Sequence, residues 1–300
     1  MIVIIIHHTE VLMSTARHLD LPMPSKEEGM TVGNGDFKEI GEEFLQLFTR
    51  LGGLKPNHDV LDVGCGIGRM ALALVNYLEP TSRFEGFDIV KHGIDWCEKN
   101  ITTRWPNFNF QHSDIYNKCY NESGRQVSRK YQFPYEDNSF DFVFLTSVFT
   151  HMLPSDMENY LGEIHRVLRP SGMAFITFFI TNPEVQGLIS QGKSTFTLQH
   201  HRGPARIEHP KLPEQVVGYE EKYLHQLFKD SGFGNEISLF PGLWCGRSKG
   251  ETWQDLVLAV KSGQPSSKQL WRRKIASWMP DVRLNPALRA ALKKLWKSIT

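Results

Sequence analysis

Cysteine is scarce in this sequence of 300 residues. The four cysteines lie far apart, and no two form a Cys-x-x-Cys pair. This spacing excludes the usual zinc motifs and a dense disulfide framework. Few and scattered cysteines are typical of proteins in a reducing compartment, so we expect a cytoplasmic protein. The four are Cys65, Cys97, Cys119 and Cys245.

Long hydrophobic runs are missing as well. The opening run Ile2-Val3-Ile4-Ile5-Ile6 is far shorter than the roughly 20 apolar residues that cross a bilayer. It also lacks the basic start and the small-residue cleavage site of a signal peptide. We therefore expect neither a membrane span nor a secretory signal from this run.

The sequence has almost no net charge, but the balance of +1 is unevenly distributed. From Lys268 onward there are nine Lys or Arg against one acidic residue, Asp281, which leaves 34 − 9 = 25 basic and 33 − 1 = 32 acidic residues elsewhere. General nucleic-acid binding depends on clustered positive charge. The acidic main part argues against a nucleic-acid partner.

The basic C-terminal stretch carries an apolar stripe at helical spacing: Leu288, Leu292, Leu295 and Ile299. We expect residues 262–300 to form a basic amphipathic helical tail. Such a helix, here with three tryptophans, is suited to an anionic membrane surface. Packing of residues 265–300 on the chain's own domain or on a second subunit is the simpler alternative, and we favour it.

Between these ends, strand patterns alternate with helical patterns. Strands separated by helices of this length indicate an α/β fold with a doubly wound, mostly parallel sheet. We expect an irregular arm over 1–36, one domain over 37–261 and, within it, an irregular insertion over 182–218. The predicted strands are 60–63, 84–89, 108–111, 140–145, 173–179, 237–240 and 255–260, and the predicted helices are 37–51, 70–78, 96–101, 156–168 and 220–229.

The most informative motif is a glycine turn after the first predicted strand, Val-Leu-Asp-Val-Gly-Cys-Gly-Ile-Gly over residues 60–68. Glycine is required where the backbone turns sharply and comes close to a ligand. The dinucleotide fingerprint Gly-x-Gly-x-x-Gly would need glycine at position 69, which is Arg69. The observed Gly-x-Gly-x-Gly, with Asp62 two residues before it, therefore weakens the interpretation as a nicotinamide-cofactor site.

Two acidic residues follow at the ends of the next two strands. Asp88 lies 20 residues beyond Gly68, where a carboxylate can accept both ribose hydroxyl protons. Asp114 closes the third strand, where it could accept from an adenine amino group. Each alone could be a helix cap or turn residue. In this order, together with the glycine turn, they indicate a site for an adenosyl group.

Residues 37–260 resemble the class I methyltransferases, in particular the small-molecule group. Further matches are Asn-Ser-Phe-Asp-Phe-Val-Phe at 138–144, Ser-Val-Phe-Thr-His-Met at 147–152, Leu-Arg-Pro-Ser-Gly at 168–172 and the closing strand at 254–259. The resemblance implies a seven-stranded Rossmann-like sheet whose last strand is antiparallel. It also implies S-adenosyl-L-methionine as cofactor. Ser171 is a departure, because the family commonly has glycine there.

The resemblance also implies roles for individual residues. Asp62 and the turn with Gly64, Cys65, Gly66 and Gly68 would hold the methionine end of the cofactor. Asp88 and Ile89 would lie at the ribose, and Asp114 with the amide of Ile115 at the adenine. The segment containing Thr146 and Ser147 would form the floor beneath the sulfonium.

The acceptor is less defined than the cofactor. A hydroxyl acceptor needs a base, and His151, after the fourth strand, is the first candidate, although it could equally pack or cap a helix. A second group lies in 182–218, where arginines could grip a carboxylate or phosphate. Tyr219 and Glu220 are weaker candidates. The second group contains His200, His201, His209, Arg202 and Arg206.

We therefore expect an enzyme that moves a methyl group to a hydroxyl or amine of a small molecule, such as a sugar or secondary metabolite. Base-methylating enzymes need an Asn/Asp-Pro-Pro-aromatic loop where this chain has Thr-Ser-Val-Phe over 146–149. No metal motif is present, and none is needed for this chemistry. Two alternatives stay open: a cofactor-binding module without turnover and, less favoured, a nicotinamide oxidoreductase.

Overall fold

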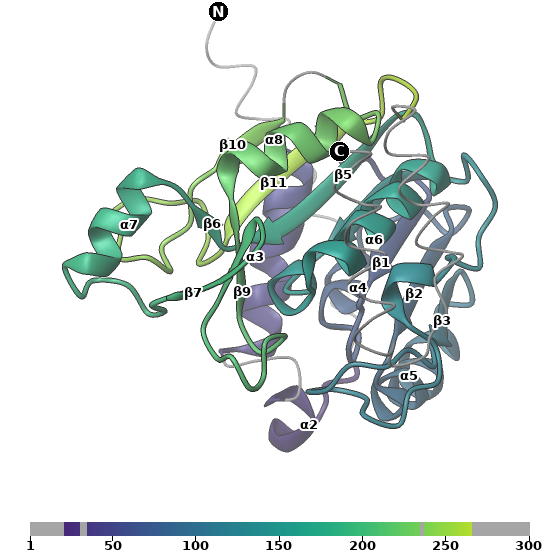
Figure 1. Cartoon of the computed structure of the whole chain (residues 1–300). Coiled ribbons are helices and arrows are strands. Elements are labelled where there is room, and N and C mark those ends of the chain that lie inside the picture. The colour runs from purple at the N-terminus through teal and green to yellow at the C-terminus, as the bar shows by residue number, and fades with distance from the viewer. Residues whose placement is uncertain (1–20, 31–34, 235–236, 266–300) are drawn as a thin grey trace, which may run out of the picture.

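The computed structural model describes residues 21–30, 35–234 and 237–265 (Figure 1). Residues 266–300 of the predicted amphipathic tail (262–300) and most of the predicted N-terminal arm lie outside the described residues. The described part of the arm includes a short helix, α2 (Lys26–Met30). In the described part of the chain, no helix combines the length and apolar character needed to cross a bilayer.

A seven-stranded sheet with the order β10-β11-β5-β4-β1-β2-β3 forms the centre of the molecule. β11 is antiparallel to both of its neighbours, and the other pairings are parallel. This confirms the predicted doubly wound sheet with an antiparallel last strand. The strands are β1 (Val60–Val63), β2 (Phe84–Asp88), β3 (Phe108–His112), β4 (Phe140–Leu145), β5 (Leu168–Phe178), β10 (Ser238–Phe240) and β11 (Asp255–Val260).

Helices cover both faces of this sheet (Figure 1). Side chains from α3, α4 and α5 join the hydrophobic cluster on one face, and those from α6 and α8 join the cluster on the other. β4 supplies both clusters in alternation, because successive side chains of a strand point to opposite faces. The helices are α3 (Phe37–Arg50), α4 (Arg69–Leu74), α5 (Lys91–Cys97), α6 (Pro154–Val167) and α8 (Glu221–Asp230), and a π-helical turn, η1 (Glu98–Thr102), continues α5.

Local sequence signals explain where two of these helices begin. Asp36 caps α3, since its carboxylate accepts from the amides of Lys38 and Glu39 at 2.9 and 2.8 Å. Pro154 occupies the first turn of α6, where its missing N–H leaves no helical bond unmade.

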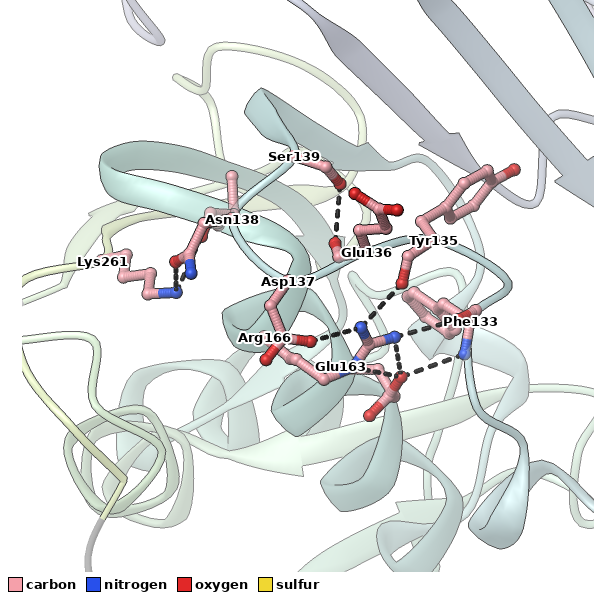
Figure 2. A network of polar contacts seen from close by, with 10 residues as sticks. Phe133, Tyr135, Glu136, Asp137, Asn138, Ser139, Glu163, Arg166 and Lys261 are labelled. Atoms are coloured by element: carbon pink, nitrogen blue, oxygen red, sulfur yellow. Dashed lines mark hydrogen bonds and ion pairs between the residues drawn. The ribbon is translucent and has the colours of Figure 1, made fainter.

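The end of α6 is tied to the loop that precedes β4 (Figure 2). The guanidinium of Arg166 donates to the carboxylates of Glu163 and Asp137, at 2.6 and 2.8 Å, and to the carbonyls of Phe133 and Tyr135. Glu163 is buried and also accepts from the Phe133 amide. Because each partner is satisfied by the others, this network fixes the loop against the helix.

The segment 182–218 is more ordered than we expected. It contains α7 (Pro183–Ser190) and contributes three strands to a second sheet with the order β6-β9-β8-β7. These strands are only two to four residues long, so they carry no detectable period. Their bounds are β6 (Ile180–Thr181), β7 (His200–Arg202), β8 (Ala205–Ile207) and β9 (Val217–Glu220).

Candidate active site

A cavity of about 400 Å³ opens at the carboxyl ends of β1, β2 and β4. This volume lies within the range of small-molecule sites. Ten of the predicted cofactor and catalytic residues line it, although they come from separate parts of the sequence. They are Asp62, Gly64, Cys65, Gly66, Asp88, Ile89, Ile115, Thr146, Ser147 and His151.

The glycine turn has the backbone that its sequence predicts. Gly64, Gly66 and Gly68 have φ of 84°, 55° and 77°, in the left-handed region that side chains rarely adopt. A Cβ on Gly64 would also lie 2.4 Å from a methyl of Val148. The turn also packs closely against α5, since a Cβ on Gly93 of that helix would lie 2.6 Å from the Gly66 carbonyl oxygen.

Asp88 holds this turn in place from the end of β2. One carboxylate oxygen accepts from the Gly66 amide at 2.7 Å, and the other accepts from the Val90 amide at 2.7 Å. Burial raises the pKa of Asp88, and the surrounding backbone amides oppose that rise. Each oxygen retains a second lone pair for a ligand hydroxyl.

Asp62 is buried at the cavity, and neither of its carboxylate oxygens has a hydrogen-bond partner among the described residues. Burial raises the pKa of Asp62 well above its ordinary value, and the charge of Asp88 adds to the rise. A buried acceptor without a partner destabilises the fold by about 1–3 kcal/mol. Such a group therefore marks a place where a donor from a ligand would be bound.

The segment after β4 is strained at Ser147. This residue has φ of 60°, which costs a non-glycine residue free energy and is found mainly at functional sites. Its amide donates to the Thr177 hydroxyl at 2.7 Å, and its own hydroxyl donates to the Gln254 side chain at 3.1 Å. These bonds, from β5 and from the residue before β11, keep the strained turn in position.

His151 lines the cavity and has a defined hydrogen-bonding state. Its Nδ1 lies 3.2 Å from the Glu214 carbonyl oxygen, and its Nε2 lies 3.3 Å from the Tyr120 hydroxyl. Burial lowers the pKa of His151, so the ring is neutral near pH 7. Since a carbonyl only accepts, Nδ1 carries the proton and Nε2 is the basic nitrogen.

Several other predicted residues lie outside the cavity lining. Asp114 instead forms an ion pair with the exposed Arg125. Gly68 caps α4, and a Cβ there would lie 2.6 Å from Ile101, so its role is in packing. The second group of candidates is also absent from the lining, and so are Tyr219 and Glu220. The Tyr219 hydroxyl instead donates to the Met152 carbonyl. The second group comprises His200, His201, Arg202, Arg206 and His209.

The structure adds lining residues that sequence reasoning missed. Tyr120 comes from the polar insertion over 116–131, and Phe196 and Val216 come from 182–218. Trp253 and Gln254 immediately precede β11. Of these five residues, Gln254 alone stands within a motif quoted above, the closing strand, and nothing in that motif indicates a cavity contact.

Comparison with known proteins agrees with this geometry. A family described as "Methyltransferase domain" matches residues 61–176, which include the glycine turn, Asp88 and His151. This match supports a class I methyltransferase, and the sheet that contains the matched residues also includes β10 and β11 beyond them. S-adenosylmethionine is the cofactor of this family.

The methyltransferase domain has curated relatives with different substrates in their names. Phosphoethanolamine N-methyltransferase 2 of Caenorhabditis elegans is 30% identical over 46% of this chain. Sterol 24-C-methyltransferase of Schizosaccharomyces pombe is 35% identical over 40% of this chain. In each case the match spans only 28% of the relative's own length.

The fold of the methyltransferase domain recurs in solved structures. The PH0226 protein of Pyrococcus horikoshii superposes with a TM-score of 0.53 at 16% identity. That alignment covers 79% of this chain and 97% of the other. Similarity at this identity concerns the fold alone.

The residues at the cavity fit S-adenosylmethionine. The unpartnered Asp62 carboxylate provides an acceptor for the positively charged methionine end, and Asp88 provides acceptors for ribose hydroxyls. The glycine turn leaves its backbone bare beside both. Within the described residues, no three His, Cys, Asp or Glu side chains form a cluster that could hold a metal ion.

Proposed function

We propose that this chain binds S-adenosylmethionine in the 400 Å³ cavity and transfers its methyl group to a hydroxyl or amine of a small molecule. The observation that carries the proposal is the buried Asp62 carboxylate, which has no partner within the described chain and lies beside the glycine turn. Asp88 and the strained Ser147 support it from the neighbouring strand ends.

When bound, the cofactor supplies an electrophilic methyl group on a sulfonium. The chain's own task is to hold an acceptor atom in line with that methyl. Alignment of this kind contributes about 7–11 kcal/mol towards lowering a reaction barrier. Ser147, fixed through Thr177 and Gln254, is placed to form the floor on which the two reactants meet.

For a hydroxyl acceptor, His151 is the group that would take the proton. Its Nε2 is the basic nitrogen, and the depressed pKa keeps it unprotonated near neutral pH. An amine acceptor that binds in its neutral form would lose its proton to the same nitrogen or to solvent. We further propose that the insertions 116–131 and 182–218 cover the acceptor, since each contributes lining residues.

Binding is the first test. Isothermal titration should give a dissociation constant for S-adenosylhomocysteine in the micromolar range and no measurable heat with NAD. Binding of NAD instead would support the oxidoreductase alternative. Absence of S-adenosylhomocysteine binding would remove the basis of the proposal.

Turnover is the second test, because a cofactor-binding module without catalysis would pass the first. The protein is incubated with methyl-labelled S-adenosylmethionine and a fractionated metabolite extract. We expect label in at least one small-molecule fraction, and label that accumulates much more slowly with a His151→Ala control if that acceptor is a hydroxyl. Retention of all label on the cofactor would favour the non-catalytic module.

A further inference from the structure

Tyr120 occupies the one nitrogen of His151 that can accept a proton. Its hydroxyl lies 3.3 Å from Nε2, and the two rings meet edge to face with centroids 5.2 Å apart. A phenol is protonated at neutral pH and Nε2 carries no proton, so the Tyr120 hydroxyl is the donor. Nε2 has a single lone pair, and the hydrogen bond from Tyr120 uses it, so none is left for a substrate.

The cavity that this pair lines also has an aromatic wall. Phe179, Phe196 and Trp253 contact one another with centroid separations of 5.1 to 5.9 Å, and all three line the cavity. Among the described lining residues there is no lysine, and the single arginine, Arg69, stacks on the ring of Phe37. Arg69 is thus the one permanently charged cation among the described lining residues, and its guanidinium is already stacked on an aromatic ring.

The backbone and the side chain of Tyr120 make separate contacts. Its amide donates to the Asn117 side chain at 3.2 Å, in a turn that also includes Cys119. The side chain itself is half-exposed and makes the His151 contact. Rotation of the ring would release Nε2 without disturbing the turn.

We propose that the Tyr120 hydroxyl holds the place of the acceptor hydroxyl, and that the natural acceptor is a neutral aromatic alcohol or phenol that displaces it. The acceptor O–H then donates to His151 Nε2, and its ring packs on the aromatic wall. When the acceptor oxygen bonds to the methyl carbon, the carbon–sulfur bond breaks and the O–H proton passes to Nε2. This inference rests on the proposed function, and it makes Tyr120 a specificity-determining residue.

Equilibrium dialysis in the presence of S-adenosylhomocysteine tests the displacement. The probe is 2-naphthol, with 2-methoxynaphthalene as a matched compound that lacks the hydroxyl and 2-naphthoate as an anion. Tyr120→Phe removes the competing hydrogen bond, which is worth about 0.5–1.5 kcal/mol, or roughly 2- to 12-fold in affinity. We expect this variant to bind 2-naphthol more tightly by that factor and 2-methoxynaphthalene as the wild type does.

Tyr116→Phe is the matched control, because Tyr116 is an exposed tyrosine of the same insertion that does not line the cavity. It should bind all three probes as the wild type does. An unchanged or weaker 2-naphthol affinity in Tyr120→Phe would overturn the inference, as would an equal gain for the methoxy compound. Failure of 2-naphthol to bind, or preference for 2-naphthoate, would also overturn it.

The two levels of inference fail separately. If S-adenosylhomocysteine binds and 2-naphthol behaves against expectation, only the acceptor assignment falls. If S-adenosylhomocysteine does not bind, the proposed function falls, and the dialysis repeated without it still measures whether Tyr120 competes for His151.

Discussion

Asp88 has two tasks at the scale of a single residue: it binds the Gly66 amide of the turn, and it faces the cavity. We predict that Asp88→Ala weakens S-adenosylhomocysteine binding by about 1–3 kcal/mol, because hydrogen bonds to a charged acceptor are lost. Isothermal titration measures this, with circular dichroism to confirm folding. Asp95→Ala, on the exposed face of α5, is the control and should bind as the wild type does.

The depressed pKa of His151 predicts the acid side of the pH profile for a hydroxyl acceptor. Only the neutral ring can take a proton, and a lowered pKa keeps it neutral to lower pH. Turnover should therefore fall only below the ordinary histidine pKa of about 6.5. His151→Gln should turn over slowly and lose this limb while retaining cofactor affinity. An acid limb above pH 7 in the wild type would contradict the assignment.

We expect Asp62 to destabilise the ligand-free protein and to strengthen cofactor binding. The folded state favours the protonated form of Asp62, because its pKa is raised there. The stabilisation from that form is fully present below about pH 3.8, the ordinary pKa of the group, and is lost as the pH rises through the pKa of the folded state. Asp62→Asn should thus stabilise the ligand-free protein at pH 8 by about 1 kcal/mol, and the gain should disappear near pH 3.5. Thermal melts at both pH values measure it.

The same substitution should weaken S-adenosylhomocysteine binding at least tenfold, since an amide is a poorer acceptor for a cationic group. A variant that is less stable at pH 8 than the wild type, or that binds with unchanged affinity, would show that Asp62 is satisfied within the fold.

At the scale of elements, the Arg166 network joins α6 to the loop before β4 (Figure 2). Removal of one partner from a buried ion pair destabilises a protein by about 3–5 kcal/mol. We predict a loss of this size in urea unfolding of Arg166→Ala. Arg125→Ala breaks a solvent-screened pair with Asp114 and should leave the free energy of unfolding nearly unchanged. Similar losses in the two variants would contradict the importance of burial.

The large sheet was predictable from the sequence, and the small one was not. β4 and β11 have the predicted bounds, Phe140–Leu145 and Asp255–Val260, because both are apolar runs that end sharply. β5 begins earlier than predicted, at Leu168, and its pairing with β4 shifts register between Leu168 and Met173, where Ser171 has φ of 65°. That left-handed backbone explains why the family commonly has glycine at this position.

The site was predictable where its residues stand at the ends of recognisable strands, as Asp62 and Asp88 do. Asp114 stands in an equivalent place, yet its carboxylate is bound to Arg125, a contact that no spacing rule foresees. Tyr120 and Trp253 were missed because they reach the cavity through long-range packing of loops. A pattern read along the chain contains no information on such contacts.

For the whole molecule, ligand binding should be visible as stabilisation. A ligand that binds only the folded state stabilises it by about 2.7 kcal/mol at 100 times its dissociation constant. For a chain of this size we expect S-adenosylhomocysteine at that concentration to raise Tm by about 4–6 °C. Differential scanning fluorimetry measures the shift, with NAD at the same concentration as the control. An equal shift with NAD would contradict cofactor selectivity.

The position of Phe179 has a wider consequence. This residue stands between the last residue of β5 and the first of β6, so one stretch of backbone passes from the large sheet through the cavity wall into the small sheet. Under the proposed function, the large sheet would carry the residues that bind the adenosyl group, and the small sheet would cover part of the acceptor. A shift of one sheet against the other would then be transmitted through the backbone at Phe179 to the wall of the cavity.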